Sequence, residues 1–165
     1  MRRLAKVLCV AALIGGVATA LPAMGSSLNQ GKAAFSRGNY VLAAQLLAPL
    51  ARRGNPRAQA MLGFMYENGL GAPQAYDIAF ELYVGAAERG DPTGQYLLGL
   101  MYDKGHGAER DDVLAYKWLN LAAAAAPVRE RENYLRIRDA VASKMSLNQI
   151  VEGQRLALNW RRKSL

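Results

Sequence analysis

The sequence has 165 residues, 52% of them hydrophobic and 21% charged, and its 21 basic and 13 acidic side chains give a net charge of +8. Its one cysteine, Cys9, lies in the first apolar run, so the rest of the chain offers no disulfide, cysteine–metal site or thiolate nucleophile. The one histidine, His106, has no partners for a metal site and none for a catalytic serine, and between two glycines it is expected to be a solvated loop residue.

The first segment has the layout of a secretory signal peptide. Basic residues at positions 2, 3 and 6 precede an apolar run over residues 7–17, and small residues follow it. This predicts a signal peptide over residues 1–20, with cleavage after Ala20 or as late as Gly25. The alternative is a membrane anchor, but the run is shorter than the ~20 apolar residues of a spanning helix. The sequence therefore predicts a periplasmic or secreted protein, with no integral membrane span after cleavage.

The chain left after cleavage keeps 18 basic against 13 acidic residues, a net charge of +5. This excess has two interpretations. Basic residues near helix ends favour solubility and complement the helix dipole, or they bind a polyanion such as an envelope polysaccharide or lipid headgroups.

Residues 28–53 are expected to form a leading, degenerate helical repeat. A short helix should run to Arg37, and a second from Tyr40 to Arg53, with a Gly–Asn turn between them. This unit resembles the two that follow, with a shortened turn.

The segment "LGFMYENGLG", residues 62–71, returns as "LGLMYDKGHG", residues 98–107. The match extends to Pro56 with Pro92 and to Gln59 with Gln95, so the period is 36 residues. Periods of this size belong to helical solenoids, and the sequence predicts two repeats, residues 54–89 and 90–125.

Each repeat is expected to form two helices. In the first, Pro56 begins a helix that Asn68 and Gly69 end, and a second helix runs from about Gln74 to Arg89. In the second, a helix begins at Pro92 and ends at Gly105, and another runs from Asp111 to just before Pro127. All of these helix ends follow from the sequence pattern.

The two glycines of each turn allow two interpretations. A phosphate-binding loop would need a preceding strand and a third glycine, but Gln74 and Arg110 stand where that glycine belongs. The structural interpretation is that the first glycine ends a helix and the second lets the chain turn back. Gly63 and Gly99 should similarly allow close approach of paired helices.

Residues 128–163 are expected to form C-terminal capping helices. Ser146 and Gln149 form a capping box that begins the last of them. The result is an all-α chain of eight helices in four pairs, whose outer pairs close the hydrophobic ends of the stack.

The segments "ARRGNPRAQAMLGFMYENGLG", "AFELYVGAAERGDPTGQYLLGLMYDKGHG" and "AYKWLNLAAAA", which follow one another along the two repeats, resemble Sel1-like repeats, which are related to tetratricopeptide repeats. The first unit departs from the pattern, with Leu82 where the family prefers the tryptophan seen at Trp118, and Ala75 where an acidic residue like Asp111 is usual. The resemblance implies a right-handed α-solenoid of about four antiparallel helix pairs in a small exported bacterial protein. It also implies a scaffold that binds a protein or peptide, with no catalytic, cofactor or metal site.

In such stacks the first helix of each pair lines the concave surface, and its outward positions lie on one helical face. The residues expected to face a partner are Arg57, Ala60, Phe64, Glu67, Asn68, Thr93, Tyr96, Leu100, Asp103 and Lys104. Phe64, Tyr96 and Leu100 are either anchors for that partner or packing against neighbouring helices.

The main functional hypothesis is a non-enzymatic scaffold for a protein or peptide partner, without a nucleic-acid role. The alternatives are a surface binder of envelope polyanions or, less favoured, a carboxylate-based cell-wall hydrolase. Neither the partner nor the oligomeric state follows from the sequence.

Overall fold

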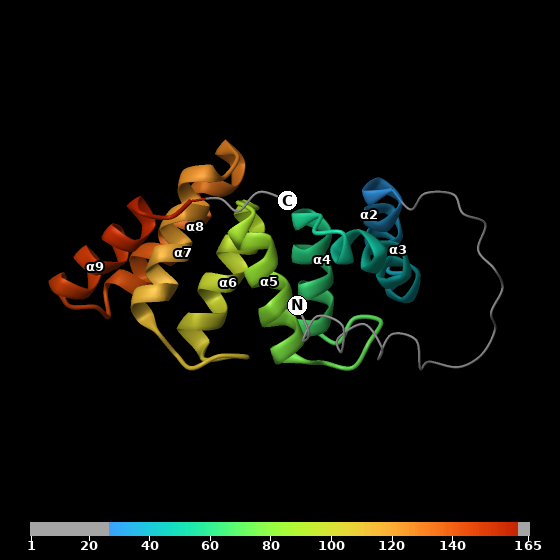
Figure 1. Ribbon diagram of the computed structural model, residues 1–165, viewed down its shortest axis with the longest axis horizontal. Coiled ribbons are helices and arrows are strands. Elements are labelled where there is room, and N and C mark those ends of the chain that lie inside the picture. The colour runs from blue at the N-terminus through green and yellow to red at the C-terminus, as the bar shows by residue number, and fades with distance from the viewer. Residues whose placement is uncertain (1–26, 162–165) are drawn as a thin grey trace.

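The computed structural model describes residues 27–161, which fold into eight α-helices and turns without a strand. The helices stack side by side into an elongated solenoid (Figure 1), which confirms the predicted fold class. Their bounds are α2 (Leu28–Ser36), α3 (Tyr40–Arg52), α4 (Pro56–Glu67), α5 (Tyr76–Glu88), α6 (Pro92–Lys104), α7 (Asp112–Ala125), α8 (Val128–Ala142) and α9 (Leu147–Leu158). The predicted signal peptide, residues 1–20, lies outside the described residues, as do the last two residues of the predicted capping region.

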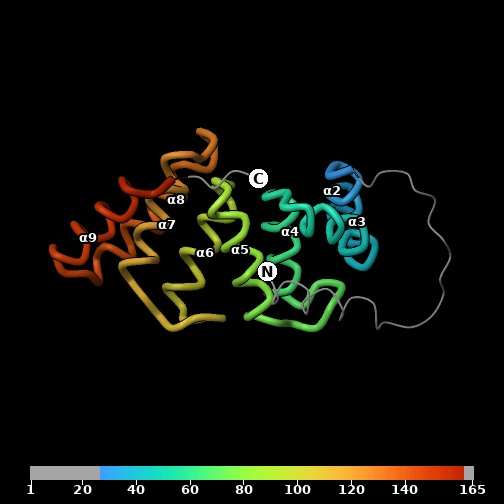
Figure 2. Tube along the Cα trace, in the orientation of Figure 1, coloured from blue at the N-terminus to red at the C-terminus, as the bar shows by residue number. Residues whose placement is uncertain are grey.

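Each helix from α2 to α7 packs on the one that follows it, and α4 also packs on α6. The final helix, α9, packs on α7, so α7 is held between the two last helices. The turns after α4 and α6 lie on the same edge of the solenoid (Figure 2). Along the chain, the first helices of the pairs (α2, α4, α6 and α8) alternate with the second helices (α3, α5, α7 and α9).

The helix ends lie where side chains can satisfy the free backbone groups. Asp91 accepts a hydrogen bond from the Gly94 N–H at 2.8 Å, and Ser146 and Gln149 form the predicted capping box. Gly69 and Gly105 have φ of +66° and +70°, as expected where a left-handed residue ends a helix.

The helix α5 begins two residues later than predicted, at Tyr76. The Gln74 side chain donates a hydrogen bond to the Glu67 carbonyl at 2.7 Å, so this residue belongs to the turn. Ala75 precedes the helix and has no side-chain acceptor for a cap.

In the first three pairs, a glycine in the first helix faces a large side chain of the second helix. Gly31 faces Leu47, Gly63 faces Tyr83, and Gly99 faces Leu119. A Cβ added to Gly63 would lie 2.7 Å from a ring carbon of Tyr83, and one on Gly99 would lie 2.7 Å from Leu119 Cγ. The predicted close approach of the paired helices is confirmed.

The second glycine of each turn has an additional role. Gly71 and Gly107 have φ of +75° and +72° and lie directly against the backbone of Tyr40 and Tyr76. Each of these tyrosines begins the second helix of the preceding pair. The glycine thus lets its turn dock on the pair before it, besides letting its own pair turn back.

The expectation that His106 is a solvated loop residue is only partly right, because the residue lies in the turn after α6 but is half-buried. Its ring lies 4.4 Å, centroid to centroid, from the ring of Tyr76, and its Nδ1 is buried without a hydrogen-bond partner among the described residues. The docking of the turn on Tyr76 brings the imidazole into this contact, which neighbouring glycines in the sequence do not reveal.

Tyr83 is fully buried, and its hydroxyl donates a hydrogen bond to a Glu67 carboxylate oxygen at 2.7 Å. Burial raises the pKa of Tyr83 far above its usual value, and the Glu67 carboxylate adds to this rise. Burial likewise raises the pKa values of Tyr66, Tyr102 and Tyr134. The folded chain therefore holds these phenolic protons more tightly than the unfolded chain does.

The protein is expected to lose stability in alkaline solution. The contribution of these raised tyrosine pKa values is fully present below about pH 10, the unfolded pKa, and is lost as the pH rises above it. Each tyrosine that stays protonated in the folded state should lower the free energy of unfolding by about 1.4 kcal/mol per pH unit there. Urea unfolding of wild type and Tyr83→Phe across this range measures the effect. Above pH 10, the free energy of unfolding of the variant should fall less steeply with pH than that of wild type, by the contribution of one tyrosine. Equal slopes in the two proteins would contradict the raised pKa of Tyr83.

Candidate binding groove

The first helices of all four pairs line one groove with a cavity volume of about 450 Å³. Its lining residues come from α2, α4, α6 and α8 and no other helix. They are Lys32, Phe35, Arg57, Ala60, Met61, Phe64, Thr93, Leu97, Glu130 and Tyr134. We call this surface the concave groove.

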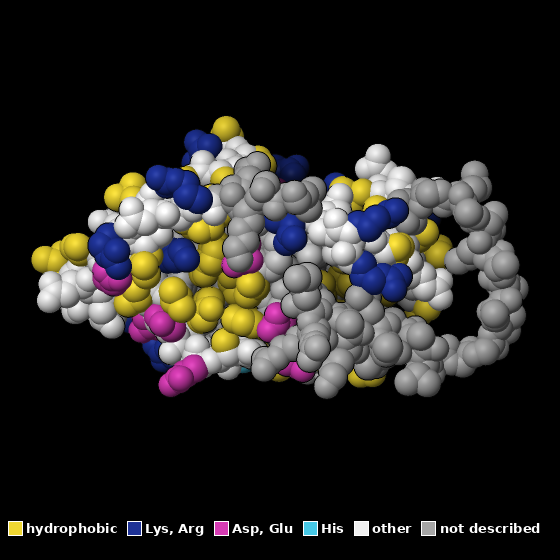
Figure 3. Space-filling model, viewed as in Figure 1, with side chains coloured by type: hydrophobic (Ala, Val, Ile, Leu, Met, Phe, Trp, Pro, Cys, Tyr) yellow, Lys and Arg dark blue, Asp and Glu magenta, His cyan; other side chains and the backbone are white. Residues whose placement is uncertain are grey.

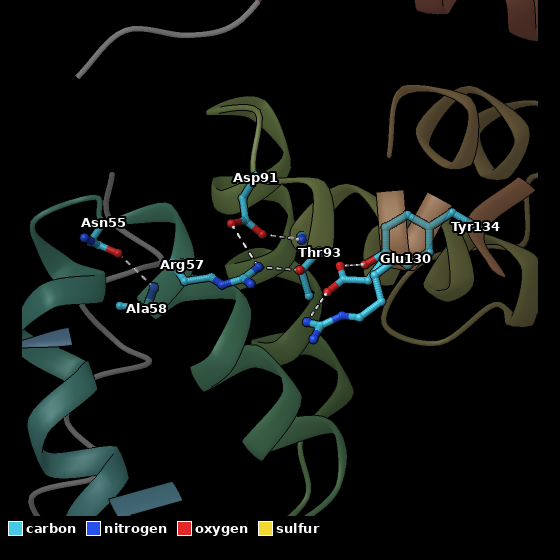
Figure 4. Close-up of polar contacts among 9 residues, drawn as sticks. Asn55, Arg57, Ala58, Asp91, Thr93, Glu130 and Tyr134 are labelled. Carbon is cyan, nitrogen blue, oxygen red and sulfur yellow. Dashed lines mark hydrogen bonds and ion pairs between the residues drawn. The ribbon is translucent and has the colours of Figure 1, made fainter. Parts of the chain in front are cut away.

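A polar rim runs along one side of the concave groove, at the starts of α4, α6 and α8 (Figure 4). Arg57, in the first turn of α4, donates a hydrogen bond to the Thr93 hydroxyl and lies 3.5 Å from an oxygen of Asp91. Asp91 is largely buried, and its other oxygen caps α6 through the Gly94 N–H. One guanidinium therefore joins two successive repeats through a residue that also begins a helix.

The rim continues to α8 through Tyr134. Its hydroxyl donates a hydrogen bond to Glu130 at 3.3 Å, and its ring stacks on Tyr96 with the centroids 4.2 Å apart. Burial raises the pKa of Tyr134, the hydrogen bond with Thr93 acts against this rise, and the Glu130 carboxylate adds to it. The tyrosine is therefore a neutral donor at physiological pH.

The floor of the concave groove is apolar. Phe64 is 37% exposed, and its ring meets Phe35 edge to face with the centroids 6.1 Å apart. Met61 and Leu97 complete this floor. A partly exposed aromatic ring among other apolar side chains is typical of the centre of a recognition surface.

The structure brings four of the ten sequence-predicted residues together in the groove lining, namely Arg57, Ala60, Phe64 and Thr93. Tyr96 lies behind the lining, against Tyr134. The other five residues are on the same two helices or their ends but outside the lining, and they are Glu67, Asn68, Leu100, Asp103 and Lys104.

Three of these outer residues already have intramolecular partners. Glu67 accepts the hydrogen bond from Tyr83, Asn68 donates to the Phe64 carbonyl at 2.8 Å, and Asp103 pairs with Lys144 at 2.6 Å. Their side chains stabilise helix ends and contacts between helices.

The sequence did not predict the lining residues of the first and last pairs, because these pairs do not keep the 36-residue spacing. It also did not predict Met61 and Leu97, which keep that spacing but stand one position after a predicted residue. Gly31 and Gly63 occupy equivalent places against their second helices, although they are only 32 residues apart. With that spacing, Lys32 would have been aligned with Phe64. Tyr134 had a weaker signal, as the one aromatic residue in the polar helix α8.

Glu130 is the one carboxylate among the lining residues of the concave groove, and it lies beside Arg129 at 3.5 Å and beside the Tyr134 hydroxyl. Between residues 27 and 161 there is no group of three or more histidine, cysteine or acidic side chains placed to hold a metal ion. None of the helices described there is long and apolar enough to span a membrane.

The surface charges are partly segregated. In the view of Figure 3, lysine and arginine side chains lie mostly toward the upper edge and acidic side chains mostly toward the lower edge. Hydrophobic side chains gather between them over the middle of the stack.

Comparisons with known proteins agree with this architecture. The family model of the Sel1 repeat matches residues 56–91 and 92–126. The chain is similar to the crystal structure of a protective antigen of uropathogenic Escherichia coli strains that displays an SLR fold, with a TM-score of 0.73 and 25% identity. It is also similar to a Sel1 repeat protein from Oxalobacter formigenes, with a TM-score of 0.64 and 26% identity.

These likenesses cover 80% and 82% of this chain, which spans 28% of the first structure and 56% of the second. No curated protein matches the chain.

Proposed function

From the two Sel1 repeats and the Sel1-type solenoid that this chain forms, we infer that it is a non-enzymatic scaffold that binds a protein or peptide partner in the concave groove. Sel1 repeats generally mediate protein interactions, and solenoids use their concave surfaces for binding. The protein acts in the periplasm or outside the cell, after removal of its signal peptide.

The observation that carries this proposal is the apolar floor of the concave groove, with Phe64 at its centre. The core is complete without the outer face of this ring, since Leu62, Met65 and Tyr66 on the same helix fill the interior. A cavity volume of about 450 Å³ suits one or two side chains of a partner.

A pull-down from envelope extract tests the proposal with a matched pair of variants. Phe64→Asp places a carboxylate on the groove floor, whereas Val41→Asp places one on α3 at a residue that is 54% exposed and outside the lining. A specific partner should be lost with Phe64→Asp and kept with Val41→Asp, because burying an unpaired charge on binding costs several kcal/mol.

A photo-crosslinking amino acid then locates the contact. Placed at Met61 it should capture the same partner, and placed at Val151, which is exposed on α9, it should not. Equal capture at both positions, or a partner unaffected by Phe64→Asp, would contradict binding in the groove.

Salt separates this function from the polyanion alternative. A polyanion contact weakens steeply as the salt concentration rises, because binding releases counterions. A contact made mainly by the groove floor should change little. Binding that needs low salt and survives Phe64→Asp would favour the polyanion.

A further inference from the structure

The uncompensated charge of the concave groove is positive. Among the lining residues, Lys32 is exposed, and no carboxylate pairs with its ammonium in the part of the chain that the structure describes. Glu130, the acidic lining residue, already receives the Tyr134 hydroxyl and lies beside Arg129. A ligand therefore finds a free cation in the groove but a carboxylate that is already occupied.

Arg57 adds to this positive character. Its contacts with Thr93 and Asp91 both use Nη1, which leaves the Nε and Nη2 groups available, and its side chain is 38% exposed. A guanidinium donates through several N–H groups in a planar fork that matches a carboxylate. Asp91 is 9% exposed and also caps α6, so it holds Arg57 from the side while the remaining donors stay open.

The two basic side chains line the same groove as Phe35, Met61 and Phe64, the apolar residues of its floor, and Figure 4 shows Arg57 on the polar rim. A ligand that uses both features carries a bulky apolar side chain for the floor and a negative charge beside it. A basic segment would make no favourable charge interaction with Lys32 or Arg57. A polysaccharide or phosphate polymer would leave the apolar floor exposed to water, and so would not gain the free energy of burying it.

We propose that the partner segment recognised by the concave groove is acidic and aromatic. One aromatic or large aliphatic side chain contacts Phe35, Met61 and Phe64, and a neighbouring carboxylate pairs with Lys32 and Arg57. This assignment rests on the proposed function, because it specifies which peptides the same groove selects.

Selection from a phage-displayed library of random peptides tests the proposal on the purified protein. Peptides that bind wild type but not Phe64→Asp should be enriched in aspartate or glutamate next to an aromatic or large aliphatic residue. Enrichment of basic peptides, or of apolar peptides without an acidic preference, would overturn the acidic assignment and leave the scaffold function standing. Selection of no peptide that depends on Phe64 would contradict both.

A charge-reversal cycle then tests the ion pair with an enriched peptide. Fluorescence anisotropy should show that Lys32→Glu weakens binding about fivefold to tenfold, and that replacing the peptide's acidic residue by its amide weakens binding to wild type comparably. The amide peptide should bind Lys32→Glu and wild type about equally, because the pair is then already broken. If the protein change and the peptide change each weakened binding by the same factor whether or not the other was present, the ion pair would be contradicted.

Two variants control this measurement. Arg52→Glu makes the same change of net charge at an exposed residue outside the lining and should leave the affinity within about twofold of wild type. Lys32→Arg keeps the charge and should retain binding.

Dextran sulfate serves as the polyanion probe. If it displaced the peptide and bound Phe64→Asp as well as wild type, the groove would be a general anion surface and the proposal would fail.

Discussion

Replacing Gly107 by alanine is expected to lower the free energy of unfolding by about 3 to 4 kcal/mol, whereas the same change at Gly105 should cost about 1 kcal/mol. Both glycines lie in the turn after α6 with positive φ, so alanine pays the left-handed backbone penalty at either position. They differ in the space around them. A Cβ on Gly107 would meet the Tyr76 carbonyl, whereas one on Gly105 would make only ordinary contacts, the nearest 3.4 Å from Arg110 Cβ.

Urea unfolding of the two variants and wild type measures the difference directly. Since the backbone strain is shared, the excess loss at Gly107 reports the docking of the turn on the preceding pair. Equal losses in the two variants would mean that the turn moves away from Tyr76 without cost. A urea slope unchanged by mutation confirms that the comparison concerns folded-state stability.

Leu119→Ala is expected to lower the free energy of unfolding by about 3 kcal/mol, because this side chain is fully buried. Gly99→Ala should lower it by about 1 to 2 kcal/mol, since its new methyl would lie 2.7 Å from Leu119 Cγ. The two residues face each other across α6 and α7. The double variant should therefore lose less than the two single losses together, by about 1 kcal/mol or more.

A second double-mutant cycle, of Gly99→Ala with Leu98→Ala, distinguishes this steric coupling from a general loss of packing. Leu98 is fully buried in α6 next to Gly99 in sequence, and successive side chains of a helix point in different directions around its axis, so it is a buried reference that does not face Gly99 across the helix pair. Gly99→Ala and Leu98→Ala should add nearly independently. Additive losses in the Gly99 and Leu119 cycle would show that α6 and α7 separate to accept the methyl.

The helix order and most helix ends could be predicted from the sequence, because they rest on local chemistry. Asp91, Pro92 and Gly105 act within one helix, and their effects on the backbone are the same in any fold. The start of α5 was placed too early because Gln74 bonds back to the preceding helix. The contact between the His106 and Tyr76 rings was missed for a similar reason, since the two residues belong to different repeats.

The candidate site was predictable only in part. The 36-residue period identified two of the four lining helices, α4 and α6, and their faces carrying Arg57, Phe64 and Thr93. It did not identify Lys32 or Tyr134, which belong to pairs that depart from the period. It also could not show that Tyr96 is occupied by stacking on Tyr134, because that contact joins helices from different pairs.

The docking of each glycine turn on the preceding pair has a direction. Gly71 lies against Tyr40 and Gly107 against Tyr76, and in both cases the receiving tyrosine comes earlier in the chain. A chain that emerges with its amino end first, from a ribosome or from a membrane, therefore presents each receiving tyrosine before the turn that docks on it. Assembly of this stack can thus advance step by step from the amino end, without waiting for the carboxyl-terminal helices.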